Sequence, residues 1–195
     1  MTTHHDDESA KHIAEYVASL EEELITRGLL NVAQFEGLME TYFAECGYLH
    51  GARAVARAWV NEDFKALLLG DAPTAFQQLG ISNYDPITVV ENTDEVHNVV
   101  VCTLCSCYPF WVLGLSPVWY RSLEYRARVV REPRKVLAEF GVHIPVTRRV
   151  RVWDSSSDMR YMVMPIRPPR AQSTTEDELV RVITRDSLIG TEELA

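Results

Sequence analysis

The chain has 195 residues, of which 47% are hydrophobic and 24% are charged, and its formal net charge at pH 7 is -9. This length predicts one sizeable domain, alone or with an extended arm, and the composition is typical of a protein with a buried core. The negative charge argues against nucleic acid as a partner, and the lack of any run of about 18 apolar residues argues against a membrane.

The N-terminal region, residues 1–48, is predicted to form a helical arm. Its first residues are polar and acidic and contain no apolar signal segment, which favours the cytoplasm. Two helices are predicted, from Ser9 to Arg27 and from Asn31 to Gly47, and alone they bury little. The arm is therefore expected to pack on a partner subunit. Its apolar positions at helical spacing are Ile13, Tyr16, Val17, Leu20 and Leu24 in the first helix and Phe35, Leu38, Met39, Tyr42 and Phe43 in the second.

Residues 49–195 are predicted to form an α+β domain. Its most informative segment is Asn98–Cys102, a β-branched run without polar alternation, which is typical of a strand buried on both faces. The stretch from Thr175 to Glu178 is a capping-box pattern that predicts the start of the last helix. Other helical patterns cover 52–60, 61–69, 75–80, 119–130 and Pro133–Gly141, and other strand patterns cover 87–92, 149–153 and 161–164.

Three of the four cysteines follow this buried strand directly, in the stretch VVVCTLCSCYP. Cys105 and Cys107 could hold one metal ion through both sulfur atoms and through the deprotonated backbone amides of Ser106 and Cys107. Cys102 could cap this near-planar set from one side, which leaves a sixth position open for a substrate. Because deprotonated amides need a high-charge ion, trivalent cobalt or iron is favoured over zinc.

Spacing alone leaves three other interpretations open. A structural zinc site could take Cys46 or a histidine as its fourth ligand. An iron–sulfur cluster is less well supported, because Cys46 lies far upstream of the other three cysteines. A redox dithiol in the CTLC sequence would not need the third cysteine.

The cysteine stretch and several later segments resemble the α subunit of nitrile hydratase. The similarity runs from about Gly51 to Gly190 and includes VCTLCSC, LGLSPVWYRSLEYRARVVREPRKVLAEFG, RVWDSSSDMRYMVMP and VITRDSLIG, in the same order and spacing. The resemblance implies the nitrile hydratase alpha-subunit fold, a helical N-terminal arm plus a layered α-β-β-α domain. The cysteine motif also resembles that of the γ subunit of thiocyanate hydrolase.

The resemblance assigns roles to the residues of the cysteine stretch. It implies that Cys102, Cys105 and Cys107 bind the metal through sulfur, and that Ser106 and Cys107 complete the plane through their amides. It also implies that Cys105 is oxidised to a sulfinate and Cys107 to a sulfenate. Thr103 resembles the cobalt-binding branch of the family, so Co(3+) is expected and Fe(3+) is the less favoured ion.

The implied reaction is the hydration of a small-molecule nitrile to an amide, with Cys107 and Ser106 as catalytic residues. Cys107 would act as the nucleophile or as the base that activates water, and Phe110 and Trp111 would either line the pocket mouth or pack in the core. The implied partners are a β-type subunit, present as one chain or split into two, and a metallochaperone or activator. Two alternatives stay open: a thiocyanate hydrolase γ-like subunit, and a cobalt-carrying subunit that is inactive alone.

Overall fold

The structure is a computed structural model that describes residues 3–45, 47–81, 85–171 and 175–194, without the side chains of 3–10, 38 and 41–45. The prediction for Cys46 and the side-chain predictions for Leu38, Tyr42 and Phe43 lie outside the described part. The chain divides into two compact units, Met1–Ala44 and Glu45–Ala195. None of the described helices combines the length and the hydropathy that a membrane crossing needs.

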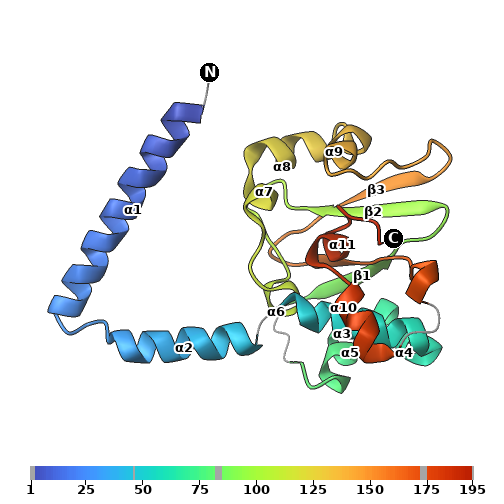
Figure 1. The fold of residues 1–195 in the computed structure, drawn as a ribbon, viewed down its shortest axis with the longest axis horizontal. Helices are drawn as coiled ribbons and strands as arrows, with labels where there is room; N and C mark the ends of the chain where they lie inside the picture. The colour runs from blue at the N-terminus through green and yellow to red at the C-terminus, as the bar shows by residue number, and fades with distance from the viewer. Residues whose placement is uncertain (1–2, 46, 82–84, 172–174, 195) are drawn as a thin grey trace. The chain divides into compact units, whose positions relative to one another are not determined.

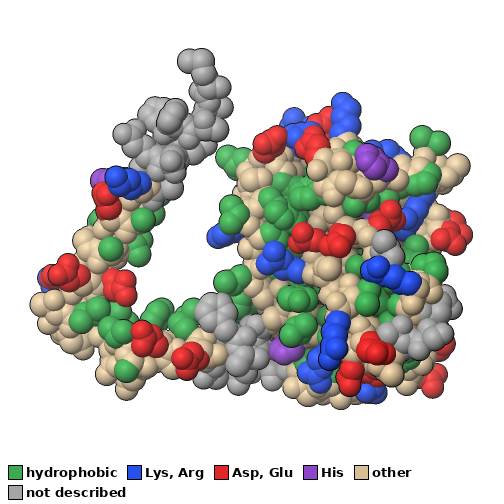
Figure 2. Space-filling model, in the orientation of Figure 1, with side chains coloured by type: hydrophobic (Ala, Val, Ile, Leu, Met, Phe, Trp, Pro, Cys, Tyr) green, Lys and Arg blue, Asp and Glu red, His purple; other side chains and the backbone are tan. Residues whose placement is uncertain are grey.

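The first unit, Met1–Ala44, contains the two predicted helices, α1 (Thr3–Thr26) and α2 (Val32–Glu45, whose last residue lies beyond the division). The α1 helix begins before Ser9, where the sequence predicted its start. Asn31 caps α2 as predicted, since its Oδ1 accepts a hydrogen bond from the Gln34 amide at 3.1 Å. The described apolar residues of both helices are largely exposed, and Figure 2 shows apolar side chains along them. The exposed ones include Ile13, Tyr16, Val17, Leu20, Leu24 and Phe35.

The second unit, Glu45–Ala195, is an α+β domain, which confirms the predicted fold class. Figure 1 shows two thin sheets between helices, with α8 and α9 beside β3 and with α3, α4 and α5 on the other side, below β1. The elements are α3 (Tyr48–Val60), α4 (Glu62–Gly70), α5 (Ala72–Gln78), β1 (Ile87–Glu91), β2 (Val96–Val101), α6 (Phe110–Leu113), α7 (Val118–Arg121), α8 (Leu123–Val129), α9 (Pro133–Glu139), β3 (Arg149–Asp154), β4 (Arg160–Met164), the 3-10 helix Pro169–Ala171, α10 (Glu176–Val182) and α11 (Arg185–Ile189).

Both sheets are pairs of parallel strands that lie far apart in the sequence. Strand β1 pairs with β4, and β2 pairs with β3, with Val96 opposite Arg149 and Val101 opposite Asp154. Strand β2 is buried from His97 to Val101, which confirms the predicted buried strand. Because the strands of a pair run in the same direction, the residues after Val101 and after Asp154 emerge side by side.

One predicted helix is divided in the structure, and the predicted last helix is followed by a further one. The helix predicted over 119–130 is split into α7 and α8, because Ser122 adopts an extended conformation and its Oγ accepts a hydrogen bond from the Tyr125 amide at 3.1 Å. The predicted capping box is present, with the Thr175 hydroxyl and amide donating to Glu178 Oε2 at 2.8 and 3.0 Å. This helix ends at Val182, and α11 follows as a separate helix.

Gly190 ends α11 at a point where the chain passes very close to β2. Its φ is +90°, and a Cβ at this position would lie 2.0 Å from the Asn98 carbonyl oxygen. The residue can therefore only be glycine unless the backbone moves, because a side chain would meet both conformational strain and a backbone clash.

Gly190→Ala is expected to lower the free energy of unfolding by more than the ~1–2 kcal/mol that a left-handed conformation alone costs. Gly80→Ala is the matched control, because Gly80 has φ +70° and nothing within 4 Å of its Cβ position. The free energies of unfolding of the two variants, measured in urea, separate the effect of the backbone clash from the effect of the conformational strain. Equal losses would show that the contact with Asn98 is not important.

His97 is a buried histidine on β2 that the sequence analysis did not single out. Its Nε2 lies 2.8 Å from the Gly190 carbonyl oxygen, and its Nδ1 lies 3.8 Å from Glu193 Oε1. Arg148 Nη1 lies 2.5 Å from the same Glu193 oxygen. Burial lowers the pKa of His97 from its ordinary value of 6.5, and the nearby Arg148 lowers it further, against the opposing effects of the Gly190 carbonyl and Glu193.

This shift predicts that acid destabilises the fold through His97. Because the pKa is lower in the folded state, the unfolded chain binds the proton more readily, so stability is present above pH 6.5 and is lost as the pH falls through the folded value. One such group changes the free energy of unfolding by at most about 1.4 kcal/mol per pH unit. Urea unfolding between pH 7.5 and 5 should show a shallower pH slope in His97→Asn, whereas the exposed His143→Asn should keep the original slope.

Candidate metal centre

The three clustered cysteines converge at the carboxyl end of β2. Cys102 follows Val101 directly and is buried, Cys107 is half-buried, and Cys105 is exposed. The sulfur of Cys105 lies 3.7 Å from that of Cys102 and 3.0 Å from that of Cys107, and all three sulfurs lie within 4.8 Å of one another. The sulfur atoms are therefore close enough to share one metal ion.

Ser106 makes this convergence possible through its backbone conformation. It is the one described non-glycine residue with a positive φ, +74°, and its hydroxyl donates to the Cys105 carbonyl oxygen. Such a conformation is uncommon outside glycine and clusters at functional sites. The turn at Ser106 brings the Cys105 and Cys107 sulfurs to the same side of the loop.

Backbone N–H groups of the loop point toward the Cys102 sulfur. The Cys105 amide donates to Cys102 Sγ at 3.3 Å. The N–H groups of Cys107 and Leu104 also face this sulfur and favour its thiolate form. Burial raises the pKa of Cys102, but these three N–H groups outweigh it and bring the pKa down to about 7. Burial, the hydrogen bond with Cys105 and the neighbouring thiols raise the pKa of Cys107 to about 12. A second thiolate in the loop is thus unfavourable unless a cation is bound there.

The loop is anchored to the neighbouring strand by Asp154, a residue that the sequence analysis did not single out. Its two carboxylate oxygens accept hydrogen bonds from the Thr103 amide at 2.9 Å and from the Thr103 hydroxyl at 2.6 Å. Asp154 is paired opposite Val101 in the β2–β3 ladder. The signal that could have identified it is its position at the end of a strand, but only after the pairing of β2 with β3 is known.

Three residues of α7 and α8 hold the loop and strand from another side, and sequence reasoning also missed them. Arg126 Nη2 donates to the carbonyl oxygens of Thr103 and Leu104, at 3.0 and 2.5 Å. Tyr120 Oη donates to the Cys107 carbonyl oxygen at 2.9 Å, and Tyr125 Oη donates to the Val100 carbonyl oxygen at 2.7 Å. Side chains from a helical segment far along the sequence therefore fix the loop backbone at both ends.

The donor set fits a thiolate-bound metal. Among the described side chains, no histidine or carboxylate oxygen joins the three sulfurs in the 4.8 Å group, so the zinc interpretation has no described fourth ligand. A cluster of three sulfurs, one of them facing backbone N–H groups, suits a transition metal that binds thiolates.

Phe110 and Trp111, predicted for the pocket mouth, lie at the start of α6 just after the cysteine loop. Both are partly exposed, and their rings contact edge to face with centroids 5.7 Å apart. The segment RVWDSSSDMRYMVMP, which also resembles the family, contains Asp158 and Arg160. Asp158 precedes β4 and is exposed, and Arg160, the first residue of β4, pairs with Asp85 at 3.4 Å.

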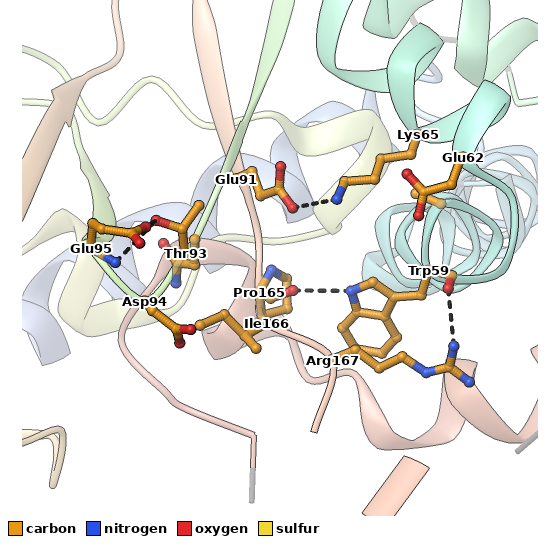
Figure 3. Close-up of a pocket in the computed structure, with 12 residues that line it drawn as sticks. Trp59, Glu62, Lys65, Glu91, Thr93, Asp94, Glu95, Pro165, Ile166 and Arg167 are labelled. Atoms are coloured by element: carbon orange, nitrogen blue, oxygen red, sulfur yellow. Dashed lines mark hydrogen bonds and ion pairs between the residues drawn. The ribbon is translucent and has the colours of Figure 1, made fainter. Parts of the chain in front are cut away.

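A separate pocket of about 380 Å³ lies at the carboxyl ends of β1 and β4 and shares no lining residue with the cysteine loop. Figure 3 shows two interactions between residues that line this pocket. Lys65 forms an ion pair with Glu91 at 2.6 Å, and the Trp59 indole donates to the Pro165 carbonyl oxygen at 3.1 Å. Arg167 donates to the Trp59 carbonyl oxygen at 3.0 Å. These pairs join α3 and α4 to the ends of the sheet.

The fold and the site together define an α+β protein whose candidate metal centre is a compact group of three cysteine sulfurs at the end of a buried parallel strand. A sequence model of the family described as nitrile hydratase, alpha chain, matches residues 11–192. The chain belongs to the nitrile hydratase α-chain family.

Known relatives come from two kinds of enzyme. The chain is 47% identical over 190 residues to the cobalt-containing nitrile hydratase subunit alpha of Pseudonocardia thermophila, covering 96% of this chain and 93% of that one. It is 42% identical over 179 residues to the thiocyanate hydrolase subunit gamma of Thiobacillus thioparus, covering 85% and 73%. A solved double mutant of the Fe-type nitrile hydratase from Comamonas testosteroni Ni1 has a TM-score of 0.87 and 38% identity, covering 94% and 91%.

Proposed function

We propose that the chain is the α-type subunit of a nitrile hydratase, which hydrates a nitrile to the corresponding amide at a trivalent metal ion. The observation that carries the proposal is the convergence of Cys102, Cys105 and Cys107 around the positive-φ turn at Ser106. Membership in the nitrile hydratase α-chain family supports it.

The metal ligands in this proposal are the sulfurs of Cys102, Cys105 and Cys107 and the backbone amides of Ser106 and Cys107. Co(3+) is the proposed ion, with Fe(3+) as the less favoured one. The support for cobalt is Thr103 between the first two cysteines and a relative named as cobalt-containing, while a structural neighbour is named as Fe-type. Cys105 is proposed to carry a sulfinate and Cys107 a sulfenate, and the exposure of Cys105 supports its oxidation.

A trivalent ion bound by this loop supplies Lewis acidity that polarises the nitrile group. Cys107 then acts as the nucleophile on the nitrile carbon or as the base that takes a proton from the attacking water. Ser106 keeps the loop in the turn that places Cys107, and its hydroxyl lies beside the reacting group. Asp154 and Arg126 hold the Thr103 backbone, so the loop does not have to reorganise during the reaction.

The proposed partner is a β-type subunit, as one chain or two, and a metallochaperone or activator would load the ion. Two exposed apolar surfaces support a large protein interface. One is the described apolar face of α1 and α2, and the other consists of Leu104 in the cysteine loop and of Leu115, Val118 and Leu123, which follow α6 in the chain. Residues 1–48 would be the arm and residues 49–195 the catalytic domain, in the cytoplasm.

A thiocyanate hydrolase γ-like subunit is the second candidate, because the chain is 42% identical to a protein of that name. The shared feature is the cysteine loop, so the difference must come from residues around the site. Phe110 and Trp111 are the residues that we propose to select the substrate at the pocket mouth.

Purification of the chain with its β-type partner, followed by assays with a nitrile and with thiocyanate, tests the proposal. Metal analysis and the mass of the peptide that contains Cys102 to Cys107 complete the test. Cobalt with two added oxygens on Cys105 and one on Cys107, together with amide formation, is the expected result. Stoichiometric zinc with unmodified cysteines would overturn the metal assignment, and turnover of thiocyanate alone would favour the second candidate. Activity of the chain only when the partner is present distinguishes an enzyme subunit from a metal carrier.

A further inference from the structure

Helix α6 carries Phe110 and Trp111, the two residues proposed to select the substrate, but it is only one turn long. It begins directly after Pro109, and no described side chain caps its first turn. An isolated helix of this length is unstable in water, because its first turn fixes three residues for one hydrogen bond. Contacts with other elements must therefore hold α6 and its two aromatic side chains in place.

The first turn of α3 provides two such contacts. Leu113 is buried and packs against Gly51, where a Cβ atom would come within 2.9 Å of Leu113 Cδ2. Beside Gly51, the half-buried His50 places its Nδ1 atom 3.0 Å from the Trp111 carbonyl oxygen, which lies 61 residues along the chain. The apolar contact brings α6 close to α3, whereas the His50 contact is directional and resists rotation of α6.

The contact between His50 and Trp111 fixes which ring nitrogen of His50 carries a proton. A carbonyl oxygen can only accept a hydrogen bond, so Nδ1 must be the donor. The last four carbonyl groups of a helix have no amide partner within that helix, and α6 has only four residues. His50 thus supplies a donor to a carbonyl group that no amide of α6 can reach.

The rings of Phe110 and Trp111 lie on the more exposed part of α6. Both side chains are partly exposed, whereas Val112 and Leu113 are buried. The two rings, called here the Phe110–Trp111 pair, contact edge to face with centroids 5.7 Å apart, a geometry that aromatic groups prefer. The aromatic group of a ligand can pack on such a pair in the same way. Rotation of the backbone at Trp111 would move both rings.

We propose that His50 is a positioning residue for substrate selection: its hydrogen bond to the Trp111 carbonyl oxygen holds the Phe110–Trp111 pair where it contacts the aromatic group of a nitrile. The role in selection rests on the proposed function, whereas the effect of the hydrogen bond on α6 does not. Acetonitrile, whose only apolar group is a methyl, should depend much less on the pair than benzonitrile does.

His50→Asn and His50→Leu are a matched pair of variants, because the Asn and Leu side chains have nearly the same size and shape. The Asn amide nitrogen can replace Nδ1 as the donor, whereas Leu can donate nothing. Hydrogen exchange of the α6 amides in the full chain should be about 2–10-fold faster in His50→Leu than in the wild type, and close to the wild-type rate in His50→Asn. The Gly114 amide reports on α6 directly, since it donates to the Phe110 carbonyl oxygen at 2.8 Å. Equal exchange rates in the two variants would overturn the positioning of α6.

A measurement on the unmodified chain does not depend on whether either variant folds. In ¹⁵N NMR of the chain with labelled histidine, the His50 ring should carry a proton on Nδ1 at pH 8. A neutral His50 ring with its proton on Nε2 would overturn the hydrogen bond.

Substrate selection has its own readout, the separate values of kcat and KM for benzonitrile and acetonitrile in the complex with the β-type partner. In His50→Leu, KM for benzonitrile should rise about 2–10-fold with kcat unchanged, and KM for acetonitrile should rise much less. His50→Asn should restore the wild-type KM for benzonitrile. An unchanged KM for benzonitrile in His50→Leu, or an equal rise for both nitriles, would overturn the role in selection. If the complex hydrates neither nitrile, the proposed function fails, but the exchange rates and the ring protonation still decide whether His50 holds α6.

Discussion

Replacement of one clustered cysteine by serine is expected to abolish both metal binding and activity. The three sulfurs lie within 4.8 Å of one another, so each one contributes to the same site. A neutral hydroxyl is a much poorer ligand than a thiolate for a trivalent ion. We expect the metal content to fall from about one ion per chain to near zero, and activity to fall by more than the ~10–100-fold that is typical for loss of a group that only supports a ligand. The variants are Cys102→Ser, Cys105→Ser and Cys107→Ser.

Cys46→Ser is the control for these variants, because it removes the chain's fourth cysteine and leaves the cluster intact. The measurements are metal content by elemental analysis and the rate of amide formation, both on the chain purified with its partner. Retention of stoichiometric metal in Cys105→Ser would contradict the proposed ligand set. Loss of metal in Cys46→Ser would instead revive the zinc interpretation, which used Cys46 as a fourth ligand.

Asp154→Asn is expected to lower metal affinity or activity by about 10–100-fold, the usual effect of removing a partner that orients a ligand. Both carboxylate oxygens of Asp154 accept hydrogen bonds from Thr103, the residue that follows Cys102. An amide side chain has only one acceptor oxygen and carries no charge, so the bond from the Thr103 amide is weakened and the bond with the Thr103 hydroxyl has to reverse its direction, with the new amide nitrogen as the donor.

Two control variants accompany this test, Thr103→Ser and Asp94→Asn. Thr103→Ser keeps the hydroxyl that Asp154 accepts from, so its effect should be smaller than that of Asp154→Asn. Asp94→Asn changes an exposed carboxylate in the separate pocket at the ends of β1 and β4, and activity should be unchanged. Metal affinity from competition with a chelator and the kcat of the complex are the readouts. An Asp154→Asn enzyme with normal metal affinity and normal kcat would show that the anchor is not needed.

The sequence predicts local features of this fold well, because they depend on residues close together in the chain. The buried strand at Asn98–Cys102 follows from its unbroken β-branched run, and the start of α10 follows from the Thr175 and Glu178 capping box. The division of one predicted helix at Ser122 is harder to foresee, since serine is also tolerated on an exposed helix surface and only its cap geometry shows the break.

The remaining features depend on which segments meet in space. That Asp154, Arg126 and Tyr120 hold the cysteine loop follows from the parallel pairing of β2 with β3 and from the packing of α7 and α8, and no local pattern encodes either. The positive φ of Ser106 could not be predicted from the sequence either, because serine rarely adopts this conformation. The candidate metal ligands could be predicted from the sequence, whereas the groups that hydrogen-bond to their loop could not.

The pairing of distant strands has a consequence for the order of events during biosynthesis. Asp154 is synthesised about fifty residues after Cys102, and β3 must be complete before it can pair with β2. Strand pairing between segments this far apart in the sequence forms slowly, because a long loop must first be closed. A nascent chain therefore exposes three closely spaced thiols before Asp154 and Arg126 can hold them in place. We expect the proposed metal ion to be held only after β3 has joined the sheet, so until then the three thiols are open to oxidation and to binding a wrong metal.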